Sequence, residues 1–250
     1  MASPSQAPVR YPNGLSTDNP FGPLANYGNP HPFAYHVLAE DFNVILDQYV
    51  QTKTSAGTIL LAAGDGGKAL FTTNATTPLA TDICSMQIGW DGFKVTAGKK
   101  MHFLARIQLS DAVNAAFIVG MIQVTTTPFT VTDGIYFQKA SGSSQIALKS
   151  AVGSAITTLN LPTTAYNLAN NTDIDLGFYM DRNGTIYAYA GANLINVQAS
   201  NAPAGQVKGS IGSFAPTLTA AGMNPTLAIQ SGTASSKTMA ADFIMAAKER

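Results

Sequence analysis

The order of apolar and polar residues predicts a chain built almost entirely of β-strands. From residue 41 onward, apolar and β-branched runs of about 5–9 residues alternate with turns rich in Gly, Asn, Asp and Ser. Many runs place an apolar residue at every second position, as a strand with one buried face does. We expect strands at Phe42–Val50, Gly57–Ala62, Ala69–Thr73, Asp82–Gln87, Lys100–Gln108, Ala115–Val124, Gly134–Gln138, Gln145–Lys149, Ala155–Leu159, Ile174–Asp181, Thr185–Ala190, Asn193–Val197, Thr226–Gln230 and Lys237–Ala246.

Turn residues between these runs predict hairpins. Gly64-Asp65-Gly66-Gly67 separates the second and third runs, and its glycines can adopt the positive φ of a tight turn. Asn183-Gly184 lies between Leu176–Met180 and Thr185–Ala190, and Asn-Gly between alternating apolar runs is among the strongest hairpin signals.

Alternation also predicts which side chains share a face. Leu176, Phe178 and Met180 lie on one side of their strand and Tyr179 on the other. In the run 101–107 we expect the odd-numbered residues to face the core. His102, Leu104 and Arg106 then face the other way.

The C-terminal run is open to two interpretations. Met239–Lys248 is rich in Ala and could form a short helix by propensity. Its odd-numbered residues from 239 to 245 are apolar, with Asp242 on the opposite side, and we therefore favour a strand. So many strands without helical partners predict an all-β, two-sheet antiparallel sandwich.

Residues 1–35 differ from the rest and predict an extended arm. Seven of the 13 prolines lie here, and proline cannot donate to a strand ladder. The segment also carries five aromatic residues, which a flexible linker does not need. It either packs over the protein's own core or docks on a neighbouring subunit through Tyr11, Phe21, Tyr27 and Phe33. We divide the chain into this arm, 1–35, and a sandwich domain, 36–250.

The charge balance argues against several kinds of partner. The 14 Lys and Arg residues match the 14 Asp and Glu residues, and charged residues are only 11 % of the chain. We therefore expect no field for nucleic acid and no polybasic membrane patch. A surface this neutral suits burial in an assembly, such as a homo-oligomer. Cys84 is the only cysteine, and no secretory signal or membrane span is recognisable, so we expect synthesis in a reducing cytoplasm.

Three stretches resemble the concanavalin A-like lectin/glucanase jelly roll. Lys100–Asp111 is similar to the long core strand of that fold, Leu176–Tyr189 to a hairpin, and Thr238–Ala246 to the closing strand. Their order and spacing along the chain also match. The resemblance implies a jelly-roll sandwich, for which glucan hydrolysis is the natural enzymatic activity.

The wider pattern resembles virion proteins of tailed bacteriophages. The similar phrases are Leu38–Phe42, Ala63–Gly67, Ala97–Lys100 and Val131–Lys139. This resemblance implies a capsid decoration or cement protein that stabilises the head. Its partners would be the major capsid protein and other copies of itself. It would be made in the host cytoplasm and located in the virion.

The residues that catalysis requires are missing from the sequence. Glucanases of this fold carry Glu-x-Asp-x-Glu on one strand, whereas this chain has only Glu40 and Glu249. The nearest acidic pair, Asp173 and Asp175, has no Glu beside it. No Gly-x-Ser-x-Gly motif occurs, and His102, within a strand, is expected to be a packed residue rather than a base.

Cofactor and metal sites are also not expected. Gly92 and Gly98-Lys99 imitate a Walker loop with the wrong spacing, and Lys100 replaces its Ser or Thr. Histidine spacing is unsuited to zinc. Aspartates in the turns could bind calcium, but Asp more often bonds its own turn backbone. We therefore expect no enzyme, no cofactor and no metal.

Carbohydrate binding is the alternative function. Trp90, Tyr179, Tyr187 and Tyr189 could form a platform on one sheet on which a sugar stacks. We favour the other interpretation, in which these rings fill the core or a subunit interface. The sequence thus predicts a structural component of a phage particle first, and a carbohydrate-binding module on the virion surface or tail second.

Overall fold

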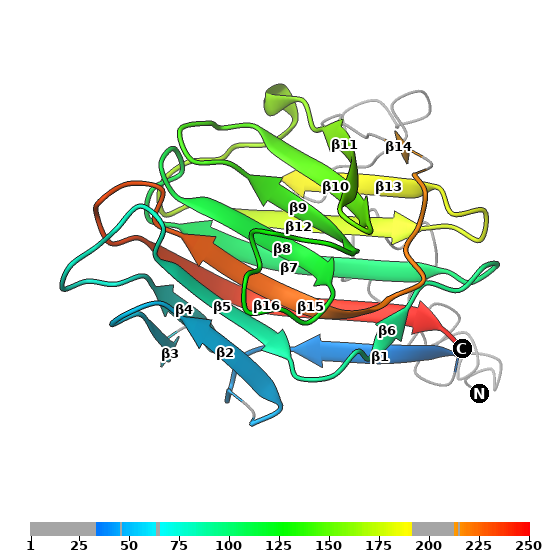
Figure 1. Cartoon of the computed structure of the whole chain (residues 1–250), viewed down its shortest axis with the longest axis horizontal. Helices are drawn as coiled ribbons and strands as arrows, with labels where there is room; N and C mark the ends of the chain where they lie inside the picture. The colour runs from blue at the N-terminus through cyan, green and yellow to red at the C-terminus, as the bar shows by residue number, and fades with distance from the viewer. Residues whose placement is uncertain (1–33, 46, 64–65, 192–212, 215) are drawn as a thin grey trace, which may run out of the picture.

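Two antiparallel sheets packed face to face make up the described part of the chain. This computed structural model describes residues 34–45, 47–63, 66–191, 213–214 and 216–250 (Figure 1). The helical element within these residues is a single 3-10 turn, η2, Thr163–Ala165. The all-β sandwich predicted from the sequence is therefore confirmed.

The first sheet, sheet A, has β7 and β16 at its centre. Its strand order is β14-β13-β12-β7-β16-β4-β3, and β1 pairs with the C-terminal half of β16. The strands are β14 (Ser213–Phe214), β13 (Ile186–Gly191), β12 (Asp173–Met180), β7 (Met101–Leu109), β16 (Thr238–Glu249), β4 (Lys68–Thr72), β3 (Thr58–Ala62) and β1 (Tyr35–Glu40).

The second sheet, sheet B, has β8 and β15 near its centre. Its strand order is β11-β10-β9-β8-β15-β5-β2, and β6 pairs with the start of β15. The strands are β11 (Ala155–Asn160), β10 (Ile146–Val152), β9 (Gly134–Lys139), β8 (Ala116–Ile122), β15 (Gly222–Gln230), β5 (Ile83–Ile88), β2 (Tyr49–Lys53) and β6 (Phe93–Lys94).

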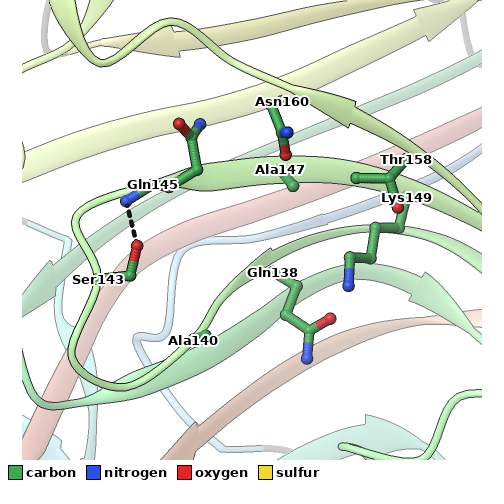
Figure 2. Close-up of a pocket in the computed structure, with 8 residues that line it drawn as sticks. All are labelled: Gln138, Ala140, Ser143, Gln145, Ala147, Lys149, Thr158 and Asn160. Carbon is green, nitrogen blue, oxygen red and sulfur yellow. Dashed lines mark hydrogen bonds between the residues drawn. The ribbon is translucent and has the colours of Figure 1, made fainter.

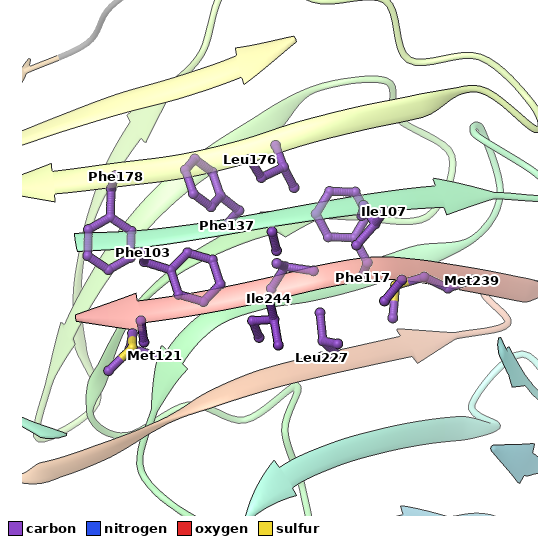
Figure 3. Close-up of a cluster of buried hydrophobic side chains, with 14 of the residues drawn as sticks. Phe103, Ile107, Phe117, Met121, Phe137, Leu176, Phe178, Leu227, Met239 and Ile244 are labelled. Carbon is purple, nitrogen blue, oxygen red and sulfur yellow. The ribbon is translucent and has the colours of Figure 1, made fainter. Parts of the chain in front are cut away.

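The core lies between the inner faces of the two sheets (Figure 3). Phe103 and Phe178 come from neighbouring strands of sheet A, and their rings stack with centroids 5.4 Å apart. Phe137 reaches Phe178 from sheet B, at 6.4 Å. Each of these rings is fully buried. Alternation along the strands places them inward, so the predicted inner faces of β7 and β12 are confirmed.

Both predicted hairpins are present. β3 pairs with β4 across the Gly-rich turn, in which Gly66 and Gly67 have φ of +85° and +100°. β12 pairs with β13 across Asp181–Gly184, and the Asp181 carboxylate accepts hydrogen bonds from the backbone N–H groups of Asn183 and Thr185. The side chain of Asp181 therefore serves the turn itself.

The strand predicted at Phe42–Val50 is wrong. The structure has β1 before this segment and β2 starting at Tyr49. Phe42 adopts a positive φ of 47° in the turn between them and is fully buried, whereas Val44 is exposed. The apolar residues there anchor a turn, so their spacing imitated a strand. Asn193–Val197 lies outside the described residues.

The C-terminal run is a strand, as favoured, but its faces change along its length. Met239 and Ala241 point into the core, and a β-bulge between Ala241 and Phe243 shifts the register. After the bulge Ile244 faces the core, and Phe243 packs on the outer face of sheet A against a second cluster that includes Leu104. The prediction that 239–245 keep one face is therefore wrong, because one extra residue moves every later side chain to the other side.

Candidate functional site

A polar groove lies on the outer face of sheet B, across β9, β10 and β11 (Figure 2). Its volume is about 250 Å³. The residues that line it are Gln138, Ala140, Ser143, Gln145, Ala147, Lys149, Thr158 and Asn160.

Strand alternation explains why these polar residues face outward. On β10, Ile146 and Leu148 point into the core, so Ala147 and Lys149 point to the other side. Ala147 lies opposite Gln138 on β9 and opposite Asn160 on β11. Register therefore places two carboxamides in one row, with a small methyl group between them.

The next row carries the charge of the groove. Lys149 lies opposite Thr158 on one side and Tyr136 on the other. Tyr136 is buried beside the groove, and burial raises the pKa of its hydroxyl to about 12. No ion pair found among the described residues involves Lys149. Its ammonium is therefore the charged group that a ligand meets.

The β9–β10 hairpin forms one rim of the groove. Ser143 Oγ accepts a hydrogen bond from the backbone N–H of Gln145 at 3.0 Å, drawn as the dashed line in Figure 2. The Gln145 amide nitrogen donates to the carbonyls of Ile146, at 2.8 Å, and Leu161. These bonds fix the side chain and leave its amide oxygen as the atom able to accept from a ligand.

The groove lining can bind hydroxyl groups but cannot supply a catalytic acid and base. Its polar groups are amides, hydroxyls and one ammonium, and none of its lining residues is a carboxylate or an aromatic ring. Glycosidic bond cleavage needs two carboxyl groups. Glu40 is the last residue of β1, whereas Glu249 of β16 lies opposite Tyr35, the first residue of β1, so the two carboxylates are a strand length apart.

The four aromatic residues of the alternative carbohydrate platform are separated by the fold. Trp90 follows β5 of sheet B and is 55 % exposed. Tyr179, Tyr187 and Tyr189 lie on β12 and β13 of sheet A. The structure does not form the alternative platform with all four residues on one sheet, because the chain crosses between the sheets after Trp90. Tyr11, Phe21, Tyr27 and Phe33 lie outside the described residues.

The three tyrosines belong to a second apolar cluster, on the outer face of sheet A. Tyr179 and Tyr189 are buried against Leu104 and Met245, and Tyr187 packs beside them. The rings of Tyr179 and Tyr187 stack with centroids 6.0 Å apart. Tyr179, at 4 % exposure, has little surface left for a sugar to stack on.

His102 is a packed residue at the border of this second cluster. Its ring lies 4.9 Å from that of Tyr179 and 5.6 Å from that of Tyr35. Burial lowers the pKa of His102 to about 3, with Lys100 adding to the effect. The imidazole is therefore neutral near pH 7 and has the structural role expected from the sequence.

The structure also bears on metals and membranes. No group of three or more His, Cys, Asp and Glu side chains suited to a metal ion occurs among the described residues. Asp175 instead pairs with Arg106, whose Nε lies 2.7 Å from the carboxylate. Within the same residues, no helix is long and apolar enough to cross a membrane.

Sequence reasoning missed the groove. Its residues are small or uncharged except Lys149, and they come from three strands and a hairpin. The one usable signal was the pair of polar residues at alternate positions, Thr158 and Asn160, which marks a solvent-facing side of a strand.

Solved structures with this fold include plant lectins. A protein of unknown function from Shewanella oneidensis MR-1 has a TM-score of 0.55 and 12 % identity, covering 86 % of this chain and 87 % of its own. Arcelin-5, a lectin-like defence protein from Phaseolus vulgaris, has a TM-score of 0.51 and 9 % identity, covering 87 % and 100 %. Lectin UEA-II, solved in complex with galactose, has a TM-score of 0.52 and 10 % identity, covering 86 % and 99 %.

These similarities extend over most of the chain and show a lectin-like jelly-roll sandwich. At such low identities they establish the fold and no more. No protein-family model and no curated protein matches the sequence.

Proposed function

We propose that this protein binds carbohydrate in the groove on sheet B, without hydrolysing it. The observation that carries the proposal is the groove's lining of amides, hydroxyls and one ammonium on adjacent strands. Sugar hydroxyls donate and accept hydrogen bonds, and carboxamides and hydroxyls can serve both needs. The lectin fold supports the proposal, since lectin UEA-II was solved in complex with galactose.

The size of the groove favours a short ligand. Pockets for small molecules usually measure about 300–1,000 Å³, and this groove holds about 250 Å³. Ala140 and Ala147 give it a shallow floor on which the C–H face of one sugar ring can rest. We expect one or two sugar residues to make the contacts, with Gln138 and Asn160 bonded to ring hydroxyls.

Two neighbouring threonines on β11 provide a matched test. Thr158 lines the groove and Thr157 faces the other side of the same edge strand, and both are exposed. The full chain is screened on a glycan array, and its best ligand is titrated by calorimetry. We expect Thr158→Val and Gln138→Ala each to weaken binding about tenfold, the loss of one hydrogen bond, and Thr157→Val to bind as the wild type does.

Failure of the array to give any ligand would reject carbohydrate binding. Equal affinities for Thr158→Val and Thr157→Val would move the site away from the groove.

A second candidate function is decoration of a bacteriophage particle. The edge strand β3 favours it, since Leu60 is 59 % exposed and Leu61 is 48 % exposed. An uncharged, apolar sheet edge suits contacts between subunits. On this proposal the protein is a capsid component that contacts the major capsid protein and other copies of itself.

The arm provides the test of this second candidate. A chain lacking residues 1–33 keeps β1 and the contact between Tyr35 and His102. We expect it to fold and to fail to attach to particles that the full chain binds. Equal attachment of both chains, measured by co-sedimentation, would reject the arm as the docking element.

A further inference from the structure

The charges of this protein are distributed unevenly over its surface. The chain is neutral, yet six of its 14 cations lie at one end of the sandwich, here named the basic end. Strand pairing places them together. Lys248 on β16 lies opposite Met101 on β7, and Met101 lies opposite Met180 at the end of β12. The Lys99 ammonium donates a hydrogen bond to the carbonyl of Arg250. The six residues are Lys94, Lys99, Lys100, Arg182, Lys248 and Arg250.

The described carboxylates at this end are fewer, and most of them are already bonded. Asp91 accepts a hydrogen bond from the Asn224 amide at 2.9 Å. Asp181 holds its own turn. Glu249 pairs with Arg182 and also accepts from the backbone N–H of Lys100.

Asp133 lies at this end too, because Gly134 pairs with Ile122 and Ile122 with Asn224, and it accepts from the Thr219 hydroxyl. Asp47 lies there because the Gln48 carbonyl accepts from the Gly89 N–H. Five carboxylates against six cations leave a small excess of positive charge, which is concentrated where Lys94, Lys99 and Lys248 lie close together.

The lysines at this end also act on one another. The pKa of Lys248 is lowered, first by burial and then by the charges of Lys99 and Lys94. Like charges this close disfavour each other, so an anion placed among them would relieve the repulsion.

A hollow of about 170 Å³ lies within the basic end, between the 95–99 loop and the 180–184 turn. Its polar lining is Lys99, Arg182, the hydroxyl of Thr96, the amide of Asn183 and the carboxylate of Asp181, which accepts hydrogen bonds from its own turn. A water molecule occupies about 30 Å³ of liquid, so the hollow has room for an acidic group with part of a sugar ring.

We propose that the basic end binds an acidic polysaccharide, with one sulfate or carboxylate group in the hollow between Lys99 and Arg182. Further acidic groups along the ligand contact Lys94 and Lys248. A saccharide fits better than a single-stranded nucleic acid, because no aromatic residue lines the hollow to stack with bases, whereas a hydroxyl and an amide do line it.

This site is distinct from the groove on sheet B. Gly222 pairs with Lys94 at the basic end, whereas the other end of β15 pairs through Gln230 with Ala116. The groove lies toward that other end, since Phe117 pairs with Lys139 just before the β9–β10 hairpin. The inference thus goes beyond the proposed function, and each site can be tested without the other.

The test measures binding of the full chain to dextran sulfate and to neutral dextran of the same length. We expect binding to dextran sulfate alone, weakening steeply as salt rises, because exposed charges are screened. The double variant Lys94→Gln, Lys248→Gln should bind about tenfold more weakly, since two exposed ion pairs are lost. The matched double variant Lys53→Gln, Lys68→Gln, which removes two charges from residues that line neither the hollow nor the groove, should bind as the wild type does.

The outcomes separate the proposal from its rivals. Equal binding by the double variant Lys94→Gln, Lys248→Gln and by its matched control would overturn it. Tighter binding to single-stranded DNA than to dextran sulfate would overturn the assignment to a saccharide. Binding to a polyuronate would support it and identify carboxylate as the group recognised. Thr158→Val should keep its affinity for dextran sulfate, so failure of the groove would not be mistaken for failure here.

Discussion

Single buried side chains hold the loops together at the end of the sandwich opposite the basic end. The Lys139 ammonium, fully buried, donates to the carbonyls of Val113, Ala115 and Ala140, the first at 2.7 Å and the last at 3.1 Å. Burial lowers its pKa to about 8. Three carbonyl acceptors satisfy the three donors of an ammonium, so this lysine ties the 113–115 segment to the end of β9.

Asp111 has the corresponding role for an acidic group. It accepts hydrogen bonds from the backbone and side chain of Asn114 and pairs with Lys237 at 2.6 Å. Burial by itself raises the pKa of Asp111, but the Asn114 bonds and the Lys237 ammonium outweigh this and bring the pKa below its usual range.

We expect this carboxylate to make stability depend on pH in acid. Because its folded pKa is depressed, the unfolded chain binds the extra proton as pH falls below about 4, and the free energy of unfolding falls there. Asp111→Asn should lower the free energy of unfolding by about 1–3 kcal/mol at pH 7 and flatten the acid slope. Urea denaturation at a series of pH values from about 2 to about 7 measures both the free energy of unfolding and its slope with pH. Identical slopes in the two proteins would contradict this assignment.

Gly120 is required by the close approach of β8 and β9. A Cβ atom there would lie 2.4 Å from the Tyr136 Cα, which is backbone and cannot rotate away. We expect Gly120→Ala to lower the free energy of unfolding by about 1–3 kcal/mol, the usual cost of overpacking. Gly92→Ala is the control, since its nearest contact would be an ordinary 3.4 Å to Trp90. Equal denaturation midpoints for the two variants would show that the strands can separate at no cost.

Among the elements, β3 is an edge strand that is open to another chain. It ends sheet A, carries no charged residue and exposes Leu60 and Leu61. We expect the full chain to self-associate as its concentration rises and Leu60→Lys to stay monomeric, because a charge at an edge blocks pairing. Sedimentation velocity measures the change. A matched substitution on the opposite edge of the sandwich, Ile156→Lys on β11, should leave self-association unchanged.

The sequence predicts an element well where alternation and turn chemistry agree. β12 and β13 satisfy both conditions, with Leu176 and Phe178 facing the core and Gly184 at φ +81° in the turn. β1 was missed because its alternation is weak, so we expected strands only from residue 41 onward, and its first residue, Tyr35, was assigned to the arm. The change of face in β16 was missed because a bulge has no periodic signal before its register is known.

The candidate site could be predicted less well than the fold. The groove depends on which strands become neighbours, and β9, β10 and β11 align Gln138, Ala147 and Asn160 only after pairing. The basic end depends in the same way on the meeting of the 95–99 loop with the C-terminal strand. Net charge concealed it, because a sum of zero carries no information about position.

At the scale of the whole molecule, the two sheets are held together by the aromatic core. Phe178 contacts Phe103 within sheet A and Phe137 across the interface. We expect Phe178→Ala to lower the free energy of unfolding by about 3–5 kcal/mol, because it leaves a cavity between the sheets. Ile156→Ala, at an exposed position, should change it by no more than about 0.5 kcal/mol in urea denaturation. Similar losses for both would mean that the sheets do not depend on this contact.

The place of β16 in sheet A has a consequence for biosynthesis. This strand is the last in the described chain, yet it lies at the centre of the sheet, between β7 on one side and β4 and β1 on the other (Figure 1). Until it leaves the ribosome, β1 and the β3–β4 hairpin have no partner joining them to β7. The sheet therefore assembles only after translation has passed its final strand, and a nascent chain interrupted before residue 238 would expose apolar edges to chaperones and proteases.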